Sequence, residues 1–284
     1  MELDFRGRTV LITGASMGIG RGLSRCFAKD GANLALTDLS SEEENLKSLA
    51  DELSSSYGIK TWTVTADLTD AKGPETLYKK VIERAGRIFG LVNNAGICWW
   101  GPFADMPFED RLERMILLNC MAYAKLSRLV LPSMIEKDEG AILNVSSVGA
   151  FQPLANMAIY AATKAFTQSL SESILYELPR KSKIVVSTLN PSFTKTRLLK
   201  DACMPDDFIP FWVSLKEVDE VTRAGYRAFK KGKMHYVVGW QNKYFHLFFP
   251  RLLPRRTVNR ISWLLCHRWS DIPLPKISEF MKGR

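Results

Sequence analysis

Tyr160 and Lys164 stand four residues apart in the segment Tyr160-Ala161-Ala162-Thr163-Lys164, so a helix would carry both side chains on one face. A free tyrosine has a pKa of about 10 and is a poor base at neutral pH, but a nearby ammonium stabilises the phenolate and lowers that pKa. Such a pair could exchange a proton with a substrate oxygen. Because the same spacing often arises by chance between solvated residues, the pair needs support from other motifs.

A second chemical motif lies near the start of the chain. Residues 14–20 read Gly-Ala-Ser-Met-Gly-Ile-Gly, directly after the apolar run 9–12 and before the helical pattern 21–28. Glycines let the backbone turn tightly and approach a pyrophosphate, whose charge then lies at a helix N-terminus. The alternative is a glycine-rich turn that only joins a strand to a helix.

The spacing of these glycines, G-x-x-x-G-x-G, resembles the short-chain dehydrogenase/reductase family, here its hydroxysteroid and retinol dehydrogenase-like branch with a C-terminal extension. The resemblance implies a nicotinamide cofactor and hydride transfer. The residues that match the cofactor-binding positions of the family are Gly14, Ser16, Met17, Gly18, Ile19, Gly20, Asp38, Asp67, Leu68, Asn93, Ala95, Gly96, Tyr160, Lys164, Pro191, Thr194 and Thr196.

Asp38 bears on the choice between NAD and NADP. It closes the second predicted strand about 20 residues after the glycines, where a carboxylate can accept hydrogen bonds from the ribose hydroxyls and repel a 2′-phosphate. Family members that use NADP often carry Arg or Lys where this chain has Met17 and Leu39. NAD is therefore the expected cofactor and NADP the alternative. Asp38 could instead cap the helix that follows.

The resemblance also assigns catalytic roles to four residues. Ser147 precedes Tyr160 by thirteen residues and would hold the substrate oxygen beside the Tyr160–Lys164 pair. Asn119 lies in an apolar helical pattern, where the family has a kink whose freed carbonyl holds a water in a proton relay to Lys164. A satisfied buried amide is the alternative for Asn119. Because all four positions are filled, we do not expect a non-catalytic, cofactor-sensing relative.

Of two further positions, Asn93 matches the family motif and Ser192 departs from it. In the N-N-A-G turn, Asn93 is expected to brace the central sheet. In the segment that begins at Pro191, Ser192 replaces the usual glycine. If that position requires a positive φ, the serine there is strained.

The elements that must position these residues alternate between short apolar runs and longer helical patterns. The candidate strands are 9–12, 33–37, 61–65, 89–92, 141–145, 184–189 and 235–238, and the plainest helices are 108–136 and 158–178. Continuous apolar strands separated by helices indicate a parallel sheet covered on both faces. We expect an α/β fold with a Rossmann-type, doubly wound, seven-stranded parallel sheet in one domain, residues 1–240, followed by a basic amphipathic extension, residues 241–284.

The substrate is predicted mainly from apolar side chains. Trp99 and Trp100 follow the N-N-A-G turn, and the segment that forms the substrate lid in the family contains Met204, Phe208, Phe211 and Trp212. This lining suits a bulky apolar alcohol or ketone, although core or subunit contacts would use the same residues. Lys195, Arg197 and Lys200 could instead receive an acidic substrate or lie in solvent.

The net charge of +9 is concentrated toward the C-terminus. From Val221 onward there are 14 Lys and Arg against Asp271 and Glu279, which gives +12, and the first 220 residues carry −3. Val258, Ile261, Leu265 and Trp269 form an apolar stripe opposite Arg256, Asn259 and Arg260. We expect this helix to cover the substrate cleft or a partner subunit; an interfacial helix on an anionic membrane is the alternative.

The cysteines and histidines limit the class of protein to which the chain can belong. The five scattered cysteines lack a C-x-x-C pair, and the three histidines lack ligand spacing, so we expect free thiols in a reducing compartment and no metal site. No signal peptide, membrane span or nucleic-acid-binding motif is recognised. We expect a cytoplasmic homodimer or homotetramer, with peripheral membrane contact through the tail as the alternative.

The leading function is an NAD-dependent oxidoreductase that interconverts a secondary alcohol and a ketone, with Tyr160 as general acid and base. An NADPH-dependent ketone or 3-oxoacyl reductase is second. A non-catalytic binding protein is the distant third.

Overall fold

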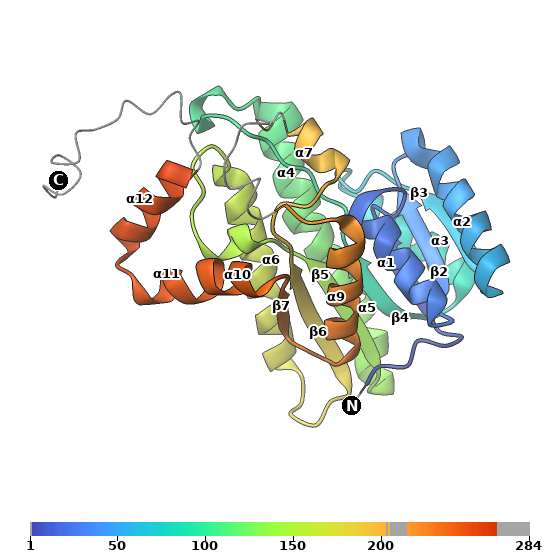
Figure 1. Ribbon diagram of the computed structural model, residues 1–284. Helices are drawn as coiled ribbons and strands as arrows, with labels where there is room; N and C mark the ends of the chain where they lie inside the picture. Colours follow the sequence, from blue (N-terminus) through green and yellow to red (C-terminus); the bar gives the residue numbers. More distant parts are fainter. Residues whose placement is uncertain (1, 203, 205–214, 266–284) are drawn as a thin grey trace, which may run out of the picture.

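The computed structural model describes residues 2–202, 204 and 215–265, whose central element is a seven-stranded sheet (Figure 1). All neighbouring strands are parallel, in the order β3-β2-β1-β4-β5-β6-β7. This confirms the predicted fold. The strands are β1 (Thr9–Thr13), β2 (Asn33–Asp38), β3 (Thr61–Thr65), β4 (Ile88–Asn93), β5 (Gly140–Val145), β6 (Ile184–Asn190) and β7 (His235–Val237).

Helices cover both faces of the sheet because its strands alternate apolar side chains between two cores. On β1, Val10 and Ile12 join one core, and Leu11 joins the other. The first core packs under α1 (Gly18–Lys29), α2 (Glu43–Tyr57) and α9 (Val218–Lys230). The second packs under α3 (Gly73–Ala85), α5 (Tyr123–Lys137) and α6 (Ala158–Glu177).

The shorter elements lie after strands, in the helical run that leads into α5, and in the C-terminal extension. They are η1 (Ser40–Glu42), η2 (Phe103–Asp105), η3 (Phe108–Glu113), α4 (Arg114–Ile116), η4 (Leu117–Ala122), η5 (Val148–Phe151), α7 (Arg197–Asp201), α10 (Trp240–Asn242), η6 (Lys243–Phe248), α11 (Phe249–Leu252) and α12 (Arg255–Leu265).

One helical run, Phe108–Lys137, is long and apolar enough to cross a membrane by length and composition alone. Its C-terminal part is α5, which packs against β4, β5 and α3 through buried side chains such as Leu126 and Val130. A core helix of a parallel sheet passes the same test, because it must bury a wide apolar face.

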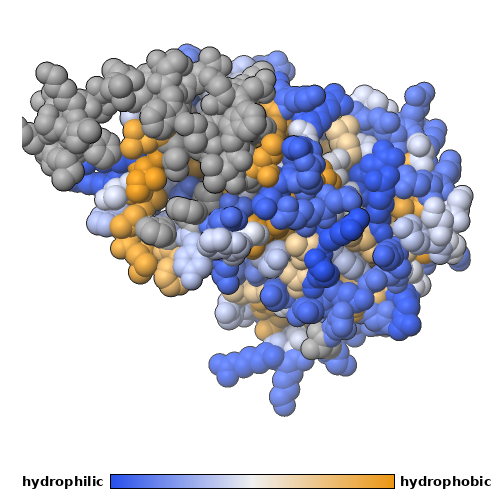
Figure 2. Space-filling model, in the orientation of Figure 1, coloured by the Kyte–Doolittle hydropathy of each residue, from blue (hydrophilic) through white to orange (hydrophobic). Residues whose placement is uncertain are grey.

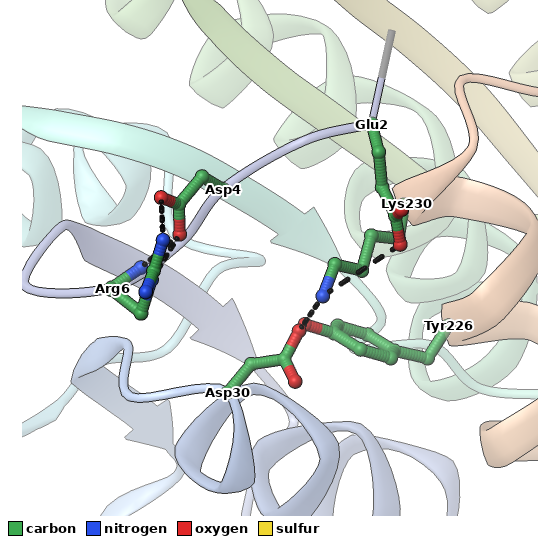
Figure 3. A network of polar contacts seen from close by, with 6 residues as sticks. All are labelled: Glu2, Asp4, Arg6, Asp30, Tyr226 and Lys230. Atoms are coloured by element: carbon green, nitrogen blue, oxygen red, sulfur yellow. Dashed lines mark hydrogen bonds and ion pairs between the residues drawn. The ribbon is translucent and has the colours of Figure 1, made fainter.

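The N-terminal segment is held to the sheet domain by an aromatic cluster and a polar network. Phe5 is buried among the rings of Phe27, Phe89, Tyr226 and Phe229. Beside this cluster, the Tyr226 hydroxyl and the Lys230 ammonium each donate a hydrogen bond of 2.6 Å to Asp30 (Figure 3). The network therefore joins the C-terminal ends of α1 and α9.

The same network sets the pKa of Asp30. Burial acts to raise the pKa of this carboxyl, but the hydrogen bonds from Lys230 and Tyr226 outweigh burial and lower it below the ordinary value. The carboxylate is therefore more stable in the folded chain than in the unfolded one.

We expect Tyr226→Phe to lower the free energy of unfolding by about 1 to 2 kcal/mol at neutral pH, because it deletes a hydrogen bond to a charged group. As the folded-state pKa of Asp30 is lowered, the stabilisation is present above its unfolded pKa and is lost as the pH falls through the folded value. Urea unfolding of both proteins at pH 7 and at pH 3 measures this. A difference between the two proteins that stays the same at both pH values would contradict the assignment.

Candidate active site

A cavity of about 410 Å³ opens where the strands of the sheet end. Its walls come from the loops that follow β1, β2, β3, β4, β5 and β6, together with α6. In a parallel doubly wound sheet, these carboxyl ends meet at one edge, where ligands bind. Most of the predicted cofactor and catalytic residues border this cavity: Gly14, Met17, Gly18, Ile19, Asp38, Asp67, Leu68, Ala95, Gly96, Ser147, Tyr160, Lys164, Pro191, Thr194 and Thr196.

The glycine segment has no room for side chains at two of its positions. A Cβ at Gly20 would lie 2.0 Å from the carbonyl oxygen of Gly14, and a Cβ at Gly14 would lie 2.9 Å from the Cα of Ala95. Gly14 and Gly18 also have φ angles of 63° and 53°, which favour glycine. The segment therefore turns tightly enough to point the N-terminus of α1 into the cavity.

Asn94 fastens this turn to the neighbouring strand. Its side-chain amide donates to the backbone oxygens of Thr13 and Gly14, at 2.9 and 3.0 Å. The Thr13 hydroxyl in turn accepts from the backbone nitrogens of Asn94 and Ala95. Asn94 borders the cavity and was not among the predicted site residues, although it stands inside the N-N-A-G motif.

Asn93 lies behind the cavity wall and not on it. Its side-chain amide donates to Asn144 at 2.8 Å and to Ser127 at 3.2 Å, and Asn144 donates onward to Ser171. This buried chain of polar groups links β4, β5, α5 and α6. It agrees with the expectation that Asn93 braces the central sheet.

Asp38 borders the cavity and also holds the glycine segment. Its Oδ2 atom accepts from the backbone nitrogen of Ser16 at 3.1 Å and from the Ser16 hydroxyl at 2.6 Å. Its Oδ1 atom accepts from the backbone nitrogen of Leu39. Neither η1 nor α2 has a side-chain cap, so Asp38 does not cap the following helix. Ser16 itself lies behind this carboxylate.

Asp67 lies at the end of β3, on the same side of the cavity. Burial raises the pKa of its carboxyl, but hydrogen bonds from Thr69 and the nearby Arg114 guanidinium, 3.5 Å away, lower it overall. The carboxylate is therefore charged at neutral pH. Arg111 and Arg114 border the cavity here, and the sequence pattern had not marked either of them.

Tyr160 and Ser147 both border the cavity, and their side chains are hydrogen-bonded to each other. Ser147 also accepts from the backbone nitrogen of Gly149 at 3.1 Å, which orients its hydroxyl. Ser146 points elsewhere, because its hydroxyl donates to the backbone oxygen of Lys164. The geometry therefore agrees with the choice of Ser147 over Ser146.

The pKa of Tyr160 moves in the direction opposite to the one expected. Burial raises it above the ordinary value, and the hydrogen bond with Ser147 offsets only part of that rise. Lys164 does not lower it in this structure. The Lys164 nitrogen lies 5.7 Å from the centre of the Tyr160 ring and donates at 2.9 Å to the backbone oxygen of Val145. Tyr160 is therefore a neutral phenol at rest.

Lys164 is almost fully buried, with 4% of its surface exposed. Burial lowers the pKa of its ammonium to about 8. The group still carries its proton for most of the time at neutral pH. It therefore supplies a positive charge to an otherwise desolvated part of the cavity wall.

Asn119 is buried in the π-helical turn η4. Its side chain exchanges hydrogen bonds with the backbone of Ile97, which orders the loop that carries Gly96. Its backbone oxygen accepts from the Thr167 hydroxyl at 3.2 Å. Asn119 is thus a satisfied buried amide, which is the alternative that the sequence left open for it.

The loop after β6 closes the cavity next to the glycine segment. Positive φ among the described non-glycine residues occurs only at Asp138 and Asn156, so the serine at position 192 is not strained. Thr194 donates to the backbone oxygen of Ser192 at 2.9 Å. Thr196 lies against Gly18, where a Cβ would be 3.1 Å from its methyl group.

The far end of the cavity is apolar. Cys98, Leu154, Met157, Phe193 and Met204 belong to one small cluster that borders it. Burial raises the pKa of Cys98 to about 12, so its thiol adds no charge. Of these residues, only Met204 had been marked by the sequence.

The predicted substrate residues fall in three places. Trp100 packs against the apolar cluster from behind, and Trp99 lies over Gly101; neither is among the described residues that border the cavity. Phe208, Phe211 and Trp212 lie outside the described residues.

Lys195 and Arg197, considered for an acidic substrate, are both paired. Lys195 forms an ion pair with Glu217. Arg197 pairs with Glu42 at 2.9 Å and with Asp201 at 3.3 Å. Only Arg197 of the two borders the cavity. The pairing reduces the positive charge available there.

The C-terminal extension contributes to the cavity wall through Ser262. This residue borders the cavity from α12, and its hydroxyl donates at 2.5 Å to the backbone oxygen of Pro153. Val258, one turn earlier, is also buried. Ile261, by contrast, is 42% exposed, so the predicted apolar stripe is not buried at this position. The Leu265 side chain and Trp269, the other members of that stripe, lie outside what the structure describes.

Known proteins resemble the chain over most of its length. It is 39% identical to the oxidoreductase UcpA of Salmonella typhimurium over 71% of this chain and 76% of that protein. It is 35% identical to the very-long-chain 3-oxoacyl-CoA reductase of Anas platyrhynchos over 68% of this chain and 62% of that protein.

Solved structures share the fold. A short-chain dehydrogenase from Sphingobium yanoikuyae, in complex with NADPH, is 31% identical and superposes with a TM-score of 0.75 over 95% of this chain and 98% of that one. The bulky-bulky ketone specific alcohol dehydrogenase from Comamonas testosteroni is 26% identical, with a TM-score of 0.69 over 97% of this chain and 99% of that one. The family model for short chain dehydrogenases matches residues 8–205, and the chain belongs to the short-chain dehydrogenase/reductase family of oxidoreductases.

Proposed function

We propose that the protein is an NAD-dependent oxidoreductase that interconverts a secondary alcohol and a ketone on a bulky apolar substrate. One observation carries this proposal: Tyr160, hydrogen-bonded to Ser147, packs against the apolar cluster and borders the same cavity as the glycine segment. A cofactor at the glycine segment and a substrate at the apolar cluster would bring their reacting atoms to these two hydroxyls.

The residues at the glycine-lined end fit a dinucleotide. Gly14 and Gly18 border the cavity without side chains, and α1 presents its N-terminus there, where a pyrophosphate is favoured. Two buried hydroxyls of the cavity wall, on Thr37 and Ser192, have no hydrogen-bond partner within the described chain. Buried polar atoms are normally satisfied, so these two suit a polar ligand.

Further cofactor contacts follow from the positions of the remaining residues. Asp38 would accept from the adenosine ribose, Asp67 and Leu68 would lie beside the adenine, and Pro191, Thr194 and Thr196 would face the nicotinamide end. When bound, the nicotinamide supplies or accepts the hydride. The protein residues handle the proton.

The proton is transferred by Tyr160, which is protonated at rest. In the reducing direction its hydroxyl donates to the carbonyl oxygen of the substrate, which the Ser147 hydroxyl holds in place. The Lys164 ammonium then stabilises the phenolate that is left behind, because two opposite charges attract strongly in a desolvated site. Asn119 would assist through its backbone carbonyl, which would hold a water that returns the proton to Lys164.

A second candidate is an NADPH-dependent ketone or 3-oxoacyl reductase. It is favoured by the relatives, since one similar structure contains NADPH and one similar protein is a very-long-chain 3-oxoacyl-CoA reductase. Asp38 speaks against it, because the carboxylate is fixed at the cavity wall where a 2′-phosphate would approach. Arg197, which pairs with Glu42 and borders the cavity, is a described cation that could offset this repulsion.

We expect Tyr160→Phe to reduce turnover by roughly 10² to 10⁴-fold, the usual contribution of a general acid, while cofactor affinity stays nearly unchanged. Cofactor fluorescence titration and steady-state kinetics on a panel of hydroxysteroids, retinols and secondary alcohols measure the two effects. Tyr78→Phe is the matched control, since it deletes the hydroxyl of a half-buried tyrosine on α3 that does not border the cavity. Turnover by Tyr160→Phe at the rate of this control would reject the mechanism.

The proposal for the cofactor predicts that NADH binds more tightly than NADPH, by about tenfold or more, equivalent to roughly 1.4 kcal/mol. Asp38→Asn removes the charge and keeps the shape, so it should bring the two dissociation constants close together. Titrations of both proteins with both cofactors test this. Tighter binding of NADPH by the unchanged protein would make the reductase the better assignment.

The C-terminal extension should influence which substrates fit, because Ser262 borders the cavity. We expect Ser262→Phe to raise KM for bulky secondary alcohols by about tenfold, as one missing or blocked apolar contact typically does, and to leave short alcohols little affected. Thr257→Phe, on the exposed side of α12, is the control. Equal effects on short and bulky substrates would place Ser262 away from the substrate.

A further inference from the structure

Four large apolar side chains at intervals of four residues form an exposed ridge after β7. We call Trp240, Tyr244, Phe248 and Leu252 the tail ridge. Trp240 and Leu252 are 71% and 70% exposed. The rings of the three aromatic residues lie in sequence, with centroids 6.5 Å and then 5.9 Å apart. In Figure 2, hydrophobic residues gather on the side of the molecule where Figure 1 draws α10–α12.

The inner side of this segment is already packed. The buried amide of Asn242 donates to the backbone oxygen of Val238 at 2.8 Å, and η6 contacts η5, the turn that follows Ser147. Val258 and Ser262 hold α12 against the cavity rim. The ridge is thus the outward face of a segment that is fixed in position, and it is not an unfinished core.

The charge around the ridge has one sign. Residues 241–265 contain Lys243, Arg251, Arg255, Arg256 and Arg260 and no acidic residue. Lys243, Arg255 and Arg256 are exposed. Exposed aromatic rings beside basic side chains, with no acidic group among them, are complementary to a surface that is both apolar and negatively charged.

A second copy of the chain fits this surface poorly. In a two-fold symmetric interface, each patch meets itself, so the exposed Lys243, Arg255 and Arg256 of one copy would face the same residues of the other. Like charges brought together in this way repel. An anionic bilayer offers an acyl boundary for the rings and phosphate groups for the basic residues.

We propose that the tail ridge and its basic neighbours form a docking surface for an anionic lipid bilayer. The rings lie in the headgroup region, and Lys243, Arg255 and Arg256 contact the lipid phosphates. The surface belongs to the same segment as Ser262, so the bound membrane lies beside the wall of the substrate cavity. This inference does not depend on the proposed reaction.

The test is co-sedimentation of the full chain with vesicles of phosphatidylcholine, with and without phosphatidylserine, at low and high salt. We expect binding only to the vesicles with phosphatidylserine, with a loss at high salt because the ions screen the charges. Arg255→Glu with Arg256→Glu should weaken binding at least tenfold, since each basic residue near the surface contributes substantially. Trp240→Ser with Tyr244→Ser should weaken it to a similar extent.

Matched control variants separate this surface from general effects. Lys79→Glu with Lys80→Glu makes the same change in net charge at two exposed lysines of α3, on the other side of the sheet domain (Figure 1). Tyr176→Ser removes an aromatic side chain that is 80% exposed on α6. Both controls should bind vesicles as the unchanged protein does, and thermal melts confirm that each variant folds.

Three results would overturn the proposal. One is the absence of sedimentation of the unchanged protein with either kind of vesicle. Another is an equal loss of binding in the α3 control, which would show a response to net charge alone. The third is sedimentation-velocity evidence that Trp240→Ser with Tyr244→Ser dissociates an oligomer, because the ridge would then be an interface between copies.

Discussion

The contact between the ends of β1 and β4 is the constraint on which the rest of the site depends. The sheet order reverses its direction of growth between these two strands, so the loops that follow them leave to opposite sides and open a crevice. The Asn94 side chain joins the ends of these two strands, because it donates hydrogen bonds to the backbone oxygens of Thr13 and Gly14. Gly20 then packs on Gly14 without a side chain, which allows α1 to begin at the wall of the cavity.

The chemistry at the cavity centre is governed by desolvation. Burial raises the pKa of Tyr160 and lowers that of Lys164, so each group is shifted toward its neutral form. The two groups lie close together but are not ion-paired, and the Lys164 ammonium is held by a backbone oxygen of β5. When Tyr160 gives up its proton, the phenolate that remains would be attracted to the Lys164 ammonium. The arrangement suits a proton donor that waits in its protonated state.

The C-terminal extension connects the cavity to the molecular surface. Its inner residues, Val258 and Ser262, pack on the cavity rim, and its outer residues present rings and basic groups to solvent. An amphipathic helix normally buries one continuous stripe, but here the stripe is divided, because Ile261 remains exposed. The extension therefore contributes to the cavity wall on its inner side and exposes aromatic and basic side chains on its outer side.

Local sequence was sufficient to predict the seven strands and the order of the motifs. Periodic apolar runs determine which segments form buried strands, and glycines, Asp38 and the Tyr160–Lys164 spacing are local signals. The brace at Asn93 was predicted from the family resemblance, and its hydrogen bonds to Ser127 and Asn144 fit that role. For Asn119, the hydrogen bonds show a satisfied buried amide, and the predicted kink and proton relay stay predictions. The relaxed backbone at Ser192 could not be predicted, since φ depends on the surrounding loop.

Contacts between segments that are distant in sequence, and the burial of the site residues, could be known only from the tertiary structure. It shows that Asp38 binds Ser16, that Asn94 joins two strand ends, and that Ser262 borders the cavity although about a hundred residues separate it from Tyr160. The pKa of Tyr160 was predicted in the wrong direction, because the sequence reveals the neighbouring ammonium but not the burial that outweighs it. Spacing along a helix or strand is encoded locally. Desolvation and contacts between distant segments exist only after the chain has folded.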